Sequence, residues 1–487
     1  MTSREQLAWA VMAAPAVIAV LIVLAPRRVV TTLAVAGGFL TAGLALALSG
    51  LEFGSLSDPV VGNWIVVDAA GGLLVCVVAV VGLCTVVVSP AYLAGADGSL
   101  VSVQRRSRTY FAVLYAFWAV LLAVPLAGNL GSAWLLIEAT TAASALLVGF
   151  SGKARALEAG WKYLILTSLG LGVALLGIVV LAAGIPRDGI GALSWQALTT
   201  YSSGSKGALV AYVLLIAGLA AKVGWAPVHN WLPDAHSEAP PPVSALLSAA
   251  LLPAVLLVAW RSEHALAPVI GARAAQDVLI FFGLVSLAVA IPFLWRSLPW
   301  KRLLAYSSLE HMGVIALGIG FGTPLALAGV AVHIVAHAVA KAVGFYAATP
   351  LVEHEPRATE SSVTGIARTH PALGGVMGIS LGALAGLPPS PLFVSEVLIV
   401  AGGFQAGRSW AAGATAVLLA LGFLGLAHAL LETTVGKARR RDAIHPRRRR
   451  TLAALGGVSL VLLLGLSAVA LWLPGSALVD ALLKGIS

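Results

Sequence analysis

Three residues spaced four positions apart interrupt an apolar run near residue 340. On a helix, His333, His337 and Lys341 share one face. Histidine changes its charge near neutral pH, and the lysine extends the same line. This pattern predicts a wire that passes protons along a membrane helix. A haem site is disfavoured, because histidines on one helix do not normally flank an iron from both sides, whereas satisfied core histidines remain an alternative.

Glu138 and Lys222 are charged residues inside two other apolar runs. A charge at the bilayer centre costs at least ~2.5–3.5 kcal/mol on insertion scales, so it needs a reason to be there. In a low dielectric, a carboxylate and an ammonium stabilise each other, and separating them favours both neutral forms. The two residues therefore predict a switch that moves a proton. A static ion pair that fixes helix packing is the alternative.

Acids recur at comparable places later in the chain. Glu310 opens one apolar run, and Glu396 follows a group of prolines in another. His428 and Glu432 lie nearer a helix end, where side chains also extend to the headgroups, so both interpretations stay open for them. The predicted proton-translocating residues are Glu138, Lys222, Glu310, His333, His337, Lys341 and Glu396.

A proline-rich stretch carries three polar residues of metal-ligand type. Asp234, His236 and Glu238 stand at alternate positions before three prolines. The prolines favour a rigid loop that caps a broken helix, rather than a metal site. Lys162 and Lys301 stand at expected helix ends, where lysines usually extend to the headgroups. None of these residues is assigned to proton transfer.

Composition defines the broad class. Of 487 residues, 59% are hydrophobic and 10% are charged, against about 25% charged in soluble domains. This argues against a water-soluble monomer, a disordered chain and a nucleic-acid-binding protein, and the apolar runs lack the alternation of a membrane β-barrel. Cys76 and Cys84 form no Cys-x-x-Cys motif, so no iron–sulfur cluster or structural zinc is expected. Neither a cofactor nor a metal site is predicted.

Apolar runs of bilayer length recur along the whole chain. A helix needs about 20 apolar residues to cross the hydrocarbon core. We therefore predict an all-α polytopic membrane protein of about fourteen transmembrane helices in one membrane domain, 1–487. The expected spans are 6–25, 29–50, 65–89, 109–127, 130–150, 161–183, 208–226, 241–260, 275–295, 303–321, 324–349, 371–401, 410–432 and 452–473.

Two spans are interrupted. The seventh ends in Lys222, Gly224 and Pro227, and the twelfth contains the sequence LPPSP at 387–391. Proline removes a backbone donor, so these helices are expected to unwind there. Each break falls in the fourth span of a set of five, and paired breaks in inverted halves indicate an ion pathway. The predicted parts are N-terminal spans over 1–107, a first five-helix repeat over 108–260, a second, inverted repeat over 275–432 and a last span over 452–473.

Basic residues predict the orientation. They cluster in loops on one side of the expected spans, which the positive-inside rule makes cytoplasmic. We expect a cell inner (plasma) membrane protein with both termini outside, and basic loops that contact lipid headgroups rather than nucleic acid. These loops account for much of the net charge of +10. The clusters are Arg27-Arg28, Arg105–Arg108, Lys153–Arg155, Arg296–Arg302 and Lys437–Arg450.

The most specific motif surrounds the break in the seventh span. The stretch AKVGWAPVHNWLPDAHSEAP at 221–240, followed by PVSALLS at 242–248, resembles the antiporter-like, proton-translocating membrane subunits of respiratory complex I. Related proteins are energy-converting hydrogenases, formate hydrogenlyase and Mrp-type sodium/proton antiporters. The stretches 301–313 and 333–341 agree. The resemblance implies fourteen helices with two inverted five-helix repeats, and charged residues along the membrane midplane.

The same resemblance assigns roles residue by residue. Glu138 and Lys222 match the family's Glu–Lys pair, and Glu396 stands at the broken-helix position that is Lys or Glu in relatives. His333, His337 and Lys341 match its central relay. Two positions depart from the pattern: Ser248 replaces a histidine of several relatives, and Ser390 replaces a common aromatic residue. With Ser248, the link from Lys222 to the centre is expected to need water.

The resemblance implies a proton-translocating subunit of a redox-driven complex, of hydrogenase or NADH:quinone oxidoreductase type. Such a subunit has no redox cofactor and works with other membrane subunits and a peripheral redox arm. H⁺ is the expected ion and Na⁺ the alternative. The sequence SSLEHMG at 307–313 favours the hydrogenase and formate-hydrogenlyase branch. Two other functions remain open: an Mrp-type Na⁺/H⁺ antiporter subunit or ion-coupled inorganic-carbon uptake module, and a structural scaffold.

Overall fold

The chain is almost entirely helical. The computed structural model describes residues 3–55, 60–96, 100–185, 190–201, 205–350, 364–437 and 446–472. In this part of the chain, twelve helices are long and apolar enough to cross a membrane. The shorter apolar helices α17 (Pro371–Leu384) and α18 (Pro391–Gln405) together form a broken span, and α20 (Pro446–Trp472) supplies another. The predicted all-α polytopic fold of about fourteen spans is confirmed.

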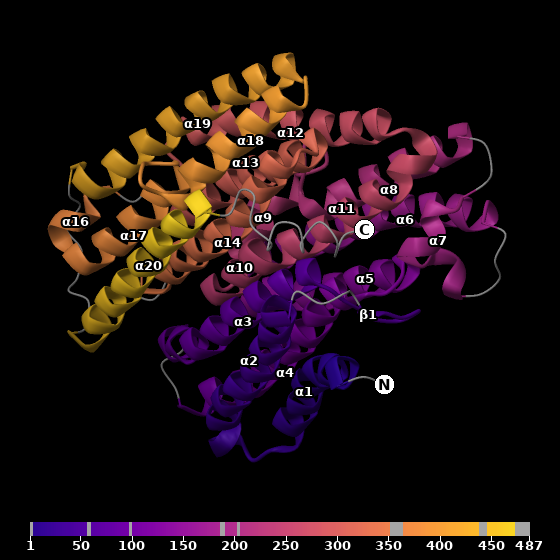
Figure 1. Ribbon diagram of the computed structural model, residues 1–487. Helices are drawn as coiled ribbons and strands as arrows, with labels where there is room; N and C mark the ends of the chain where they lie inside the picture. The colour runs from indigo at the N-terminus through magenta and orange to yellow at the C-terminus, as the bar shows by residue number, and fades with distance from the viewer. Residues whose placement is uncertain are drawn as a thin grey trace. The chain divides into compact units, whose positions relative to one another are not determined.

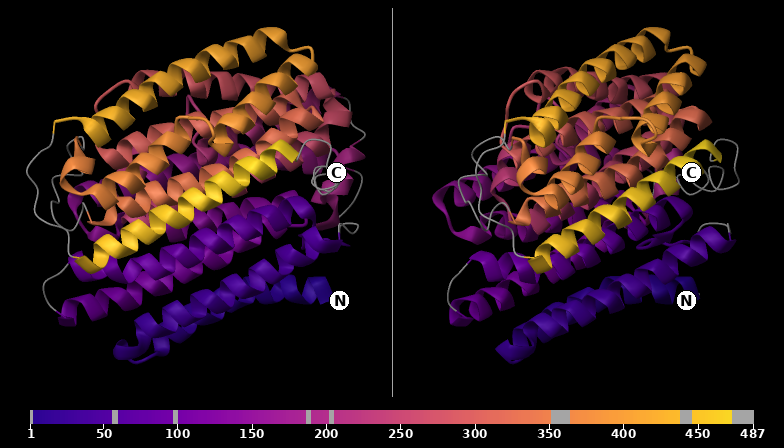
Figure 2. Two further views of the ribbon diagram at one scale, coloured as in Figure 1. Left: turned by 60° about the vertical axis from the view of Figure 1, so that its left-hand side comes forward. Right: turned by 90° about the vertical axis from the view of Figure 1, so that its left-hand side faces the viewer.

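The chain divides into two compact units, of which the first holds the described residues up to 224 and 238–278. In this unit α1, α2, α3 and α4 lie side by side, and α6 packs along α8 (Figures 1 and 2). Two short antiparallel strands, β1 (Val60–Val61) and β2 (Val66–Val67), precede α3. The other elements are α1 (Ser3–Leu24), η1 (Arg27–Val29), α2 (Val30–Ser55), α3 (Ala69–Ala96), α4 (Leu100–Ala123), η2 (Val124–Leu126), α5 (Leu130–Val148), η3 (Gly149–Ser151), α6 (Ala154–Ala183), η4 (Ile190–Leu193), α7 (Trp195–Thr199), α8 (Ser205–Val223), α10 (Pro241–Leu246), η5 (Leu247–Leu251) and α11 (Leu252–Ile270).

Helices of the first unit differ in what they contact. The run Pro241–Ile270, formed by α10, η5 and α11, is buried over its most apolar stretch, whereas α6 exposes Leu169, Leu176 and Val179. Apolar side chains on an outer face match the hydrocarbon of a bilayer, so α6 is suited to face lipid or another membrane chain. The α10–α11 run forms part of the interior of this unit.

The second unit holds residues 225–237 and the described residues from 279 to 472. Its α13 is buried over its most apolar stretch, and α14 packs against α13, α17, α18 and α20 (Figure 1). By contrast α19 exposes Trp410 and Val417. The elements are α9 (Trp231–Glu238), most of α12 (Ala272–Leu294), α13 (Trp300–Phe321), α14 (Pro324–Ala347), α16 (Ile366–Thr369), α17, α18, α19 (Ser409–Val435) and α20.

Both predicted helix breaks are present. The backbone leaves the helix after Val223 and becomes helical again at Trp231, and it leaves α17 after Leu384. Ser390 restarts the second helix, because its Oγ accepts a hydrogen bond from the N–H of Leu392 at 3.2 Å. The predicted loop at 234–238 is wrong, since these residues belong to α9: buried Trp231, Leu232 and Ala235 stabilise this short helix, and Pro233 stands in its first turn, where no backbone N–H is needed.

Two predictions, the inverted repeat and the last basic cluster, are not tested by the structure. The inverted relation of the repeats at 108–260 and 275–432 stays a prediction. The last basic cluster, Lys437–Arg450, lies largely outside the described residues, because the description omits 438–445 and the side chains of 446–450.

Candidate functional site

Each unit contains a group of buried and partly buried polar residues that includes predicted site residues. The first, here called the lysine–hydroxyl group, comprises Glu138, Thr141, Tyr163, Ser168 and Lys222. The second, called the histidine group, comprises Glu310, His311, His333, His337, Lys341, Ser307, Ser395 and Glu396.

Lys222 is the centre of the lysine–hydroxyl group. It is the last residue but one of α8, and its side chain is fully buried. Its Nζ donates hydrogen bonds to Thr141 Oγ1 of α5, at 2.7 Å, and to the Tyr163 hydroxyl of α6, at 2.5 Å. The same nitrogen lies 4.6 Å from the centre of the Tyr163 ring, a contact that stabilises a cation.

Small residues bring α6 and α8 close enough for these contacts. A Cβ added at Gly218 would lie 2.4 Å from the Ala174 backbone nitrogen, and one at Gly170 would lie 2.3 Å from the Ala221 Cβ. Neither position accepts a side chain without moving a backbone. Close approach through small residues is typical of helix pairs in membranes, and here it places Tyr163 beside Lys222.

The hydrogen bonds around Lys222 tolerate the loss of a proton. The Thr141 hydroxyl donates to Ile137 O at 3.2 Å, and the Ser144 hydroxyl donates to Thr140 O at 2.5 Å. Both partners of Lys222 therefore act as acceptors, with the Tyr163 hydroxyl donating onward to Ser144. An ammonium has three N–H donors, and two are used within the described part of the chain. A neutral amine keeps two, so both bonds survive deprotonation.

Glu138 lies one helical turn before Thr141 on α5 and is only partly buried. Its Oε1 accepts a hydrogen bond from Ser168 Oγ at 2.5 Å, and its Oε2 has no hydrogen-bond partner among the described residues. Glu138 and Lys222 attract each other, but no contact ion pair joins them in the part of the chain that the structure describes. The acid and the base therefore attract each other through space, and each has hydroxyl partners of its own.

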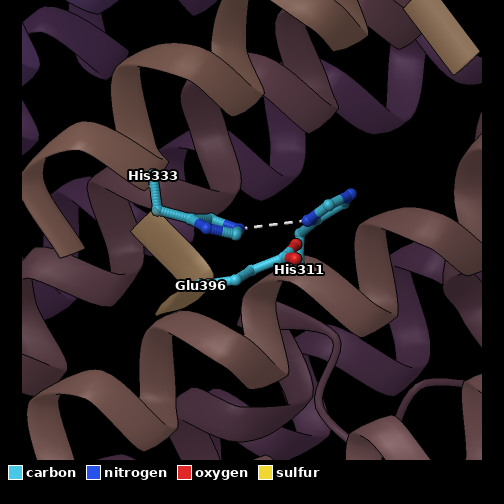
Figure 3. A group of neighbouring side chains, drawn as sticks. All are labelled: His311, His333 and Glu396. Carbon is cyan, nitrogen blue, oxygen red and sulfur yellow. Dashed lines mark hydrogen bonds between the residues drawn. The ribbon is translucent and has the colours of Figure 1, made fainter. Parts of the chain in front are cut away.

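The histidine group contains a continuous hydrogen-bonded row. His311 of α13 contacts His333 of α14 through Nδ1 and Nε2, at 3.0 Å, and His333 Nδ1 contacts Ser395 Oγ of α18, at 2.9 Å. Figure 3 shows the two rings facing each other, with the Glu396 carboxylate beside His311. One ligand-type atom from each of His311, His333 and Glu396 lies within 4.8 Å of the others.

The row fixes where its protons sit. Ser395 has one hydroxyl proton and donates it to Leu392 O at 2.7 Å, so its oxygen accepts from His333 Nδ1–H. His333 Nε2 is then a lone pair, which accepts from His311 Nδ1–H. These positions are assigned from the network. They leave His311 Nε2 as the place where an added proton binds, and the His311 ring also interacts with the Leu384 backbone.

His337 and Lys341 continue the line along α14. The His337 ring packs edge-on against His311, with centres 5.1 Å apart. Lys341 is fully buried, and its Nζ donates to Leu304 O at 2.6 Å and to Ser307 Oγ. As with Lys222, two N–H groups are used among the described contacts, so the amine would keep both bonds.

Glu310 and Glu396 each lie against a glycine. A Cβ at Gly422 of α19 would lie 2.0 Å from Glu310 Oε1, and one at Gly386 would lie 2.8 Å from Glu396 Oε2. Glu310 is buried, attracts Lys341, and has an Oε2 without a hydrogen-bond partner among the described residues. Glu396 also lines a cavity of about 610 Å³ whose other lining residues are apolar or glycine.

Other polar residues singled out in the sequence have structural roles. Lys162 is exposed and pairs with Glu158 at 2.5 Å, as a helix-end lysine would. The same expectation for Lys301 is wrong: it is buried, and its Nζ donates to Ser237 O at 2.7 Å near the end of α9. A carbonyl at a helix end is a good partner for a cation.

The proline-rich stretch contacts its own unit. Asp234 pairs with Arg302 at 3.4 Å, and His236 stacks against Phe345 with ring centres 5.4 Å apart. At the far end of the unit, His428 is exposed on α19 and Glu432 is partly exposed. The contacts of Asp234 and His236 hold α9 against its neighbours, and neither residue contacts the histidine group through them.

Several contributing residues were not assigned roles from the sequence. Thr141, Tyr163 and Ser307 supply the acceptors for the two lysines, and Ser395 orients His333. Hydroxyl residues are common in membrane helices, so only their nearness to a charged residue in the sequence could have identified them. Thr141 and Ser307 lie one turn from Glu138 and Glu310, and Tyr163 and Ser395 directly adjoin Lys162 and Glu396. His311 follows Glu310 directly, but helix periodicity points the two side chains in different directions.

Ser248 lies in a special segment. It belongs to η5, five residues of π-helix between α10 and α11, and it is fully buried. A π-turn inserts a residue into a helix and rotates the side chains that follow. The position of Ser248 therefore falls where the backbone itself is irregular.

Comparison with known proteins shows which family the chain belongs to. A profile described as "NADH:quinone oxidoreductase/Mrp antiporter, TM" matches residues 127–422, more than half of the chain. The chain is also 31% identical to the Hydrogenase-4 component F homolog of Methylacidiphilum infernorum over 78% of this chain and 80% of that protein. The chain belongs to the NADH:quinone oxidoreductase/Mrp antiporter family. The resemblance read from the sequence is thereby confirmed.

Other known proteins are similar in sequence or fold. NADH-quinone oxidoreductase subunit N of Desulforudis audaxviator is 30% identical over 73% of this chain and 70% of that one. A chain of the archaeal membrane-bound sulfane sulfur reductase has a TM-score of 0.83 at 19% identity, covering 99% of this chain and 97% of its own. A chain of the Mrp complex from Dietzia sp. DQ12-45-1b has a TM-score of 0.79 at 19% identity, covering 99% and 100%. These solved neighbours are chains of larger complexes, and the apolar helices of this family member make it a multi-pass membrane protein.

Proposed function

We propose that this family member is a proton-translocating membrane subunit of a redox-driven complex of the hydrogenase or NADH:quinone oxidoreductase type. One observation carries the proposal: each unit buries a lysine that keeps its hydrogen bonds after losing a proton. A buried charge is expensive, and a static ion pair would place a carboxylate at the ammonium. Hydroxyl and carbonyl acceptors instead leave the lysine free to change charge.

In the proposed mechanism, Glu138 controls the charge of Lys222. When Glu138 is ionised, its field favours the ammonium, and when it is neutralised, the amine is favoured. Glu138 is partly exposed, so it can respond to a charge on a neighbouring membrane chain. Electron transfer in a partner would bias this pair, and this chain itself performs no redox step.

The histidine group relays the proton. A proton arriving at His311 Nε2 makes His311 cationic, and its Nδ1–H passes to His333 Nε2 across the 3.0 Å hydrogen bond. The excess proton on His333 Nε2 then passes to the Glu396 carboxylate nearby, while His333 Nδ1–H stays hydrogen-bonded to Ser395. His337 and Lys341 feed the row from the other end of α14. Glu310 stabilises the charge of Lys341.

A pumping assay tests the assignment of the first group. Lys222→Ala and Glu138→Ala are expected to abolish proton uptake by vesicles that contain the assembled complex, while the complex still assembles. Lys162→Ala is the matched control, because Lys162 is an exposed lysine paired at the helix surface. Unchanged proton uptake in both variants would contradict the assignment.

Partners and orientation belong to the same proposal. The partners are further membrane subunits and a peripheral redox arm, and the chain sits in the cell inner (plasma) membrane with both termini outside. Affinity purification from native membranes tests this: co-purification with a hydrogenase-like or quinone-reductase-like arm supports a redox pump. Purification with small membrane subunits alone would contradict it.

The Mrp-like fold favours one alternative, a Na⁺/H⁺ antiporter subunit. The two functions differ in their energy source. A redox pump translocates protons only when an electron donor is supplied, whereas an antiporter moves them in response to a Na⁺ gradient alone. Measuring proton movement in vesicles under each condition separates them.

A further inference from the structure

In the row His311–His333–Ser395, the two histidines are arranged like metal ligands, and Ser395 stands where a hydrogen-bond acceptor would orient one of them. Zinc and similar ions bind neutral imidazole nitrogens and carboxylate oxygens at about 2.0–2.2 Å, which places neighbouring ligand atoms of a tetrahedral site roughly 3.3 Å apart. His311 Nδ1 and His333 Nε2 are 3.0 Å apart, and Glu396 completes a set within 4.8 Å.

The ligand support is also present. A metal-bound histidine usually donates its other ring N–H to an acceptor that fixes its tautomer. His333 does this through Nδ1–H to Ser395 Oγ, so its Nε2 lone pair is already aimed at His311. Both histidines are buried, and each comes from a different long helix, which keeps the pair rigid.

We propose that His311, His333 and Glu396 form a binding site for a divalent transition-metal ion such as Zn²⁺. The ion takes the place of the hydrogen-bond proton between the two rings. The His311 proton moves from Nδ1 to Nε2, so the ring stays neutral, and Glu396 binds as a carboxylate. Two nitrogens and one carboxylate favour Zn²⁺ over Na⁺, Mg²⁺ or Ca²⁺, which need more oxygen ligands.

Direct binding of Zn²⁺ to the full chain in detergent tests the site. Competition with a chromophoric chelator is expected to show one ion per chain, and X-ray absorption is expected to show two imidazole nitrogens and carboxylate oxygen. His333→Gln and Glu396→Gln are each expected to weaken binding at least tenfold. Ser395→Ala, which removes only the support, is expected to weaken it about 10–100-fold.

The control is His264→Gln, because His264 is an exposed histidine on α11, outside the group. Its affinity for Zn²⁺ should equal that of the unchanged chain. Binding that is unaltered in both His333→Gln and Glu396→Gln, or an absorption spectrum without imidazole, would overturn the site. Glu396→Gln keeps the size of the side chain, so it is expected to fold normally. The X-ray absorption spectrum is measured on the unchanged chain. The site can therefore be refuted even if one variant fails to fold.

A second readout rests on the proposed function. If the histidine group relays protons, bound Zn²⁺ should block translocation by the reconstituted complex, and Glu396→Gln should need at least tenfold more Zn²⁺ for any residual activity to be blocked. Tight binding without any block would leave the metal site standing and would contradict the relay. Absence of binding would overturn the site and leave the relay to its own test.

Discussion

Lys222 and Lys341 each place a charged group in the interior of their own unit, and each donates two hydrogen bonds to oxygen atoms. Their surroundings differ. Lys222 is held by two hydroxyls, with a partly exposed acid one turn away from one of them. Lys341 is held by a hydroxyl and a carbonyl, on the same helix face as His337 and His333.

The difference indicates a division of work. Hydroxyls and a distant carboxylate can shift the charge of one lysine but offer no chain of groups that titrate near neutral pH. The histidine row offers such a chain, with each ring in hydrogen-bond or ring contact with the next. We therefore interpret the first group as the place where charge is set and the second as the place where a proton travels.

Replacing either lysine with arginine tests what the two groups share. Lys222→Arg and Lys341→Arg keep a positive charge, but a guanidinium cannot lose its proton in a protein. Each is expected to lower proton translocation at least a hundredfold, measured as uptake by vesicles with donor supplied. Assembly on native gels is the control for folding. Translocation above a tenth of the normal rate in an assembled variant would contradict the switch.

Removing one acceptor at a time tests whether the two lysines are held equally. Tyr163→Phe and Ser307→Ala each delete one hydrogen bond to a charged donor, worth about 1.5–3 kcal/mol. Each is expected to slow translocation about tenfold or more by disfavouring the ammonium. Rates are measured in the same vesicle assay, with Tyr201→Phe, on a loop tyrosine, as the control for Tyr163→Phe. Normal rates in both variants would show that these bonds only pack helices.

Loosening the histidine row should affect the second group alone. Ser395→Ala removes the acceptor that fixes His333 with its proton on Nδ1. Nitrogen NMR of the labelled histidines is expected to show one dominant tautomer of His333 in the unchanged chain and a mixture in the variant. Translocation is expected to fall several-fold. A variant with an unchanged His333 spectrum would refute the proton assignment.

The smallest expected effect comes from displacing an acid without changing any charge. Gly422→Ala would place a methyl group 2.0 Å from Glu310 Oε1, so the carboxylate must move away. We expect a two- to fivefold loss of translocation. Gly413→Ala, on the same helix, has open space around its added Cβ and should behave as the unchanged chain. Equal translocation rates in the two variants would show that the position of Glu310 does not matter for proton translocation.

The sequence predicts the spans and their breaks well, because hydrophobic length and proline act locally. It also indicates Lys222, Lys341 and the two histidines of α14, since a charged or polar side chain is conspicuous in an apolar run. It does not show that Thr141 and Tyr163 accept the hydrogen bonds of Lys222, because the approach of Tyr163 depends on the glycine-packed contact of α6 with α8.

Two misinterpretations have the same physical origin. Lys301 stands at a helix end, which predicts a side chain that extends to the headgroups, yet the carbonyl of Ser237 gives it a buried partner. The prolines near Asp234 predict a loop, yet buried Trp231 and Leu232 stabilise a short helix. In both cases a contact with a segment distant in sequence, or with the interior, outweighs the local pattern.

The charge state of the two lysines is the central claim, and nitrogen NMR of the complex labelled at lysine Nζ tests it most directly. Lys222→Met and Lys341→Met identify the two signals. We predict that both signals are ammonium in the resting complex, and that a neutral-amine fraction appears at each when an electron donor is supplied. Signals that stay fully ammonium while the complex translocates protons would contradict it.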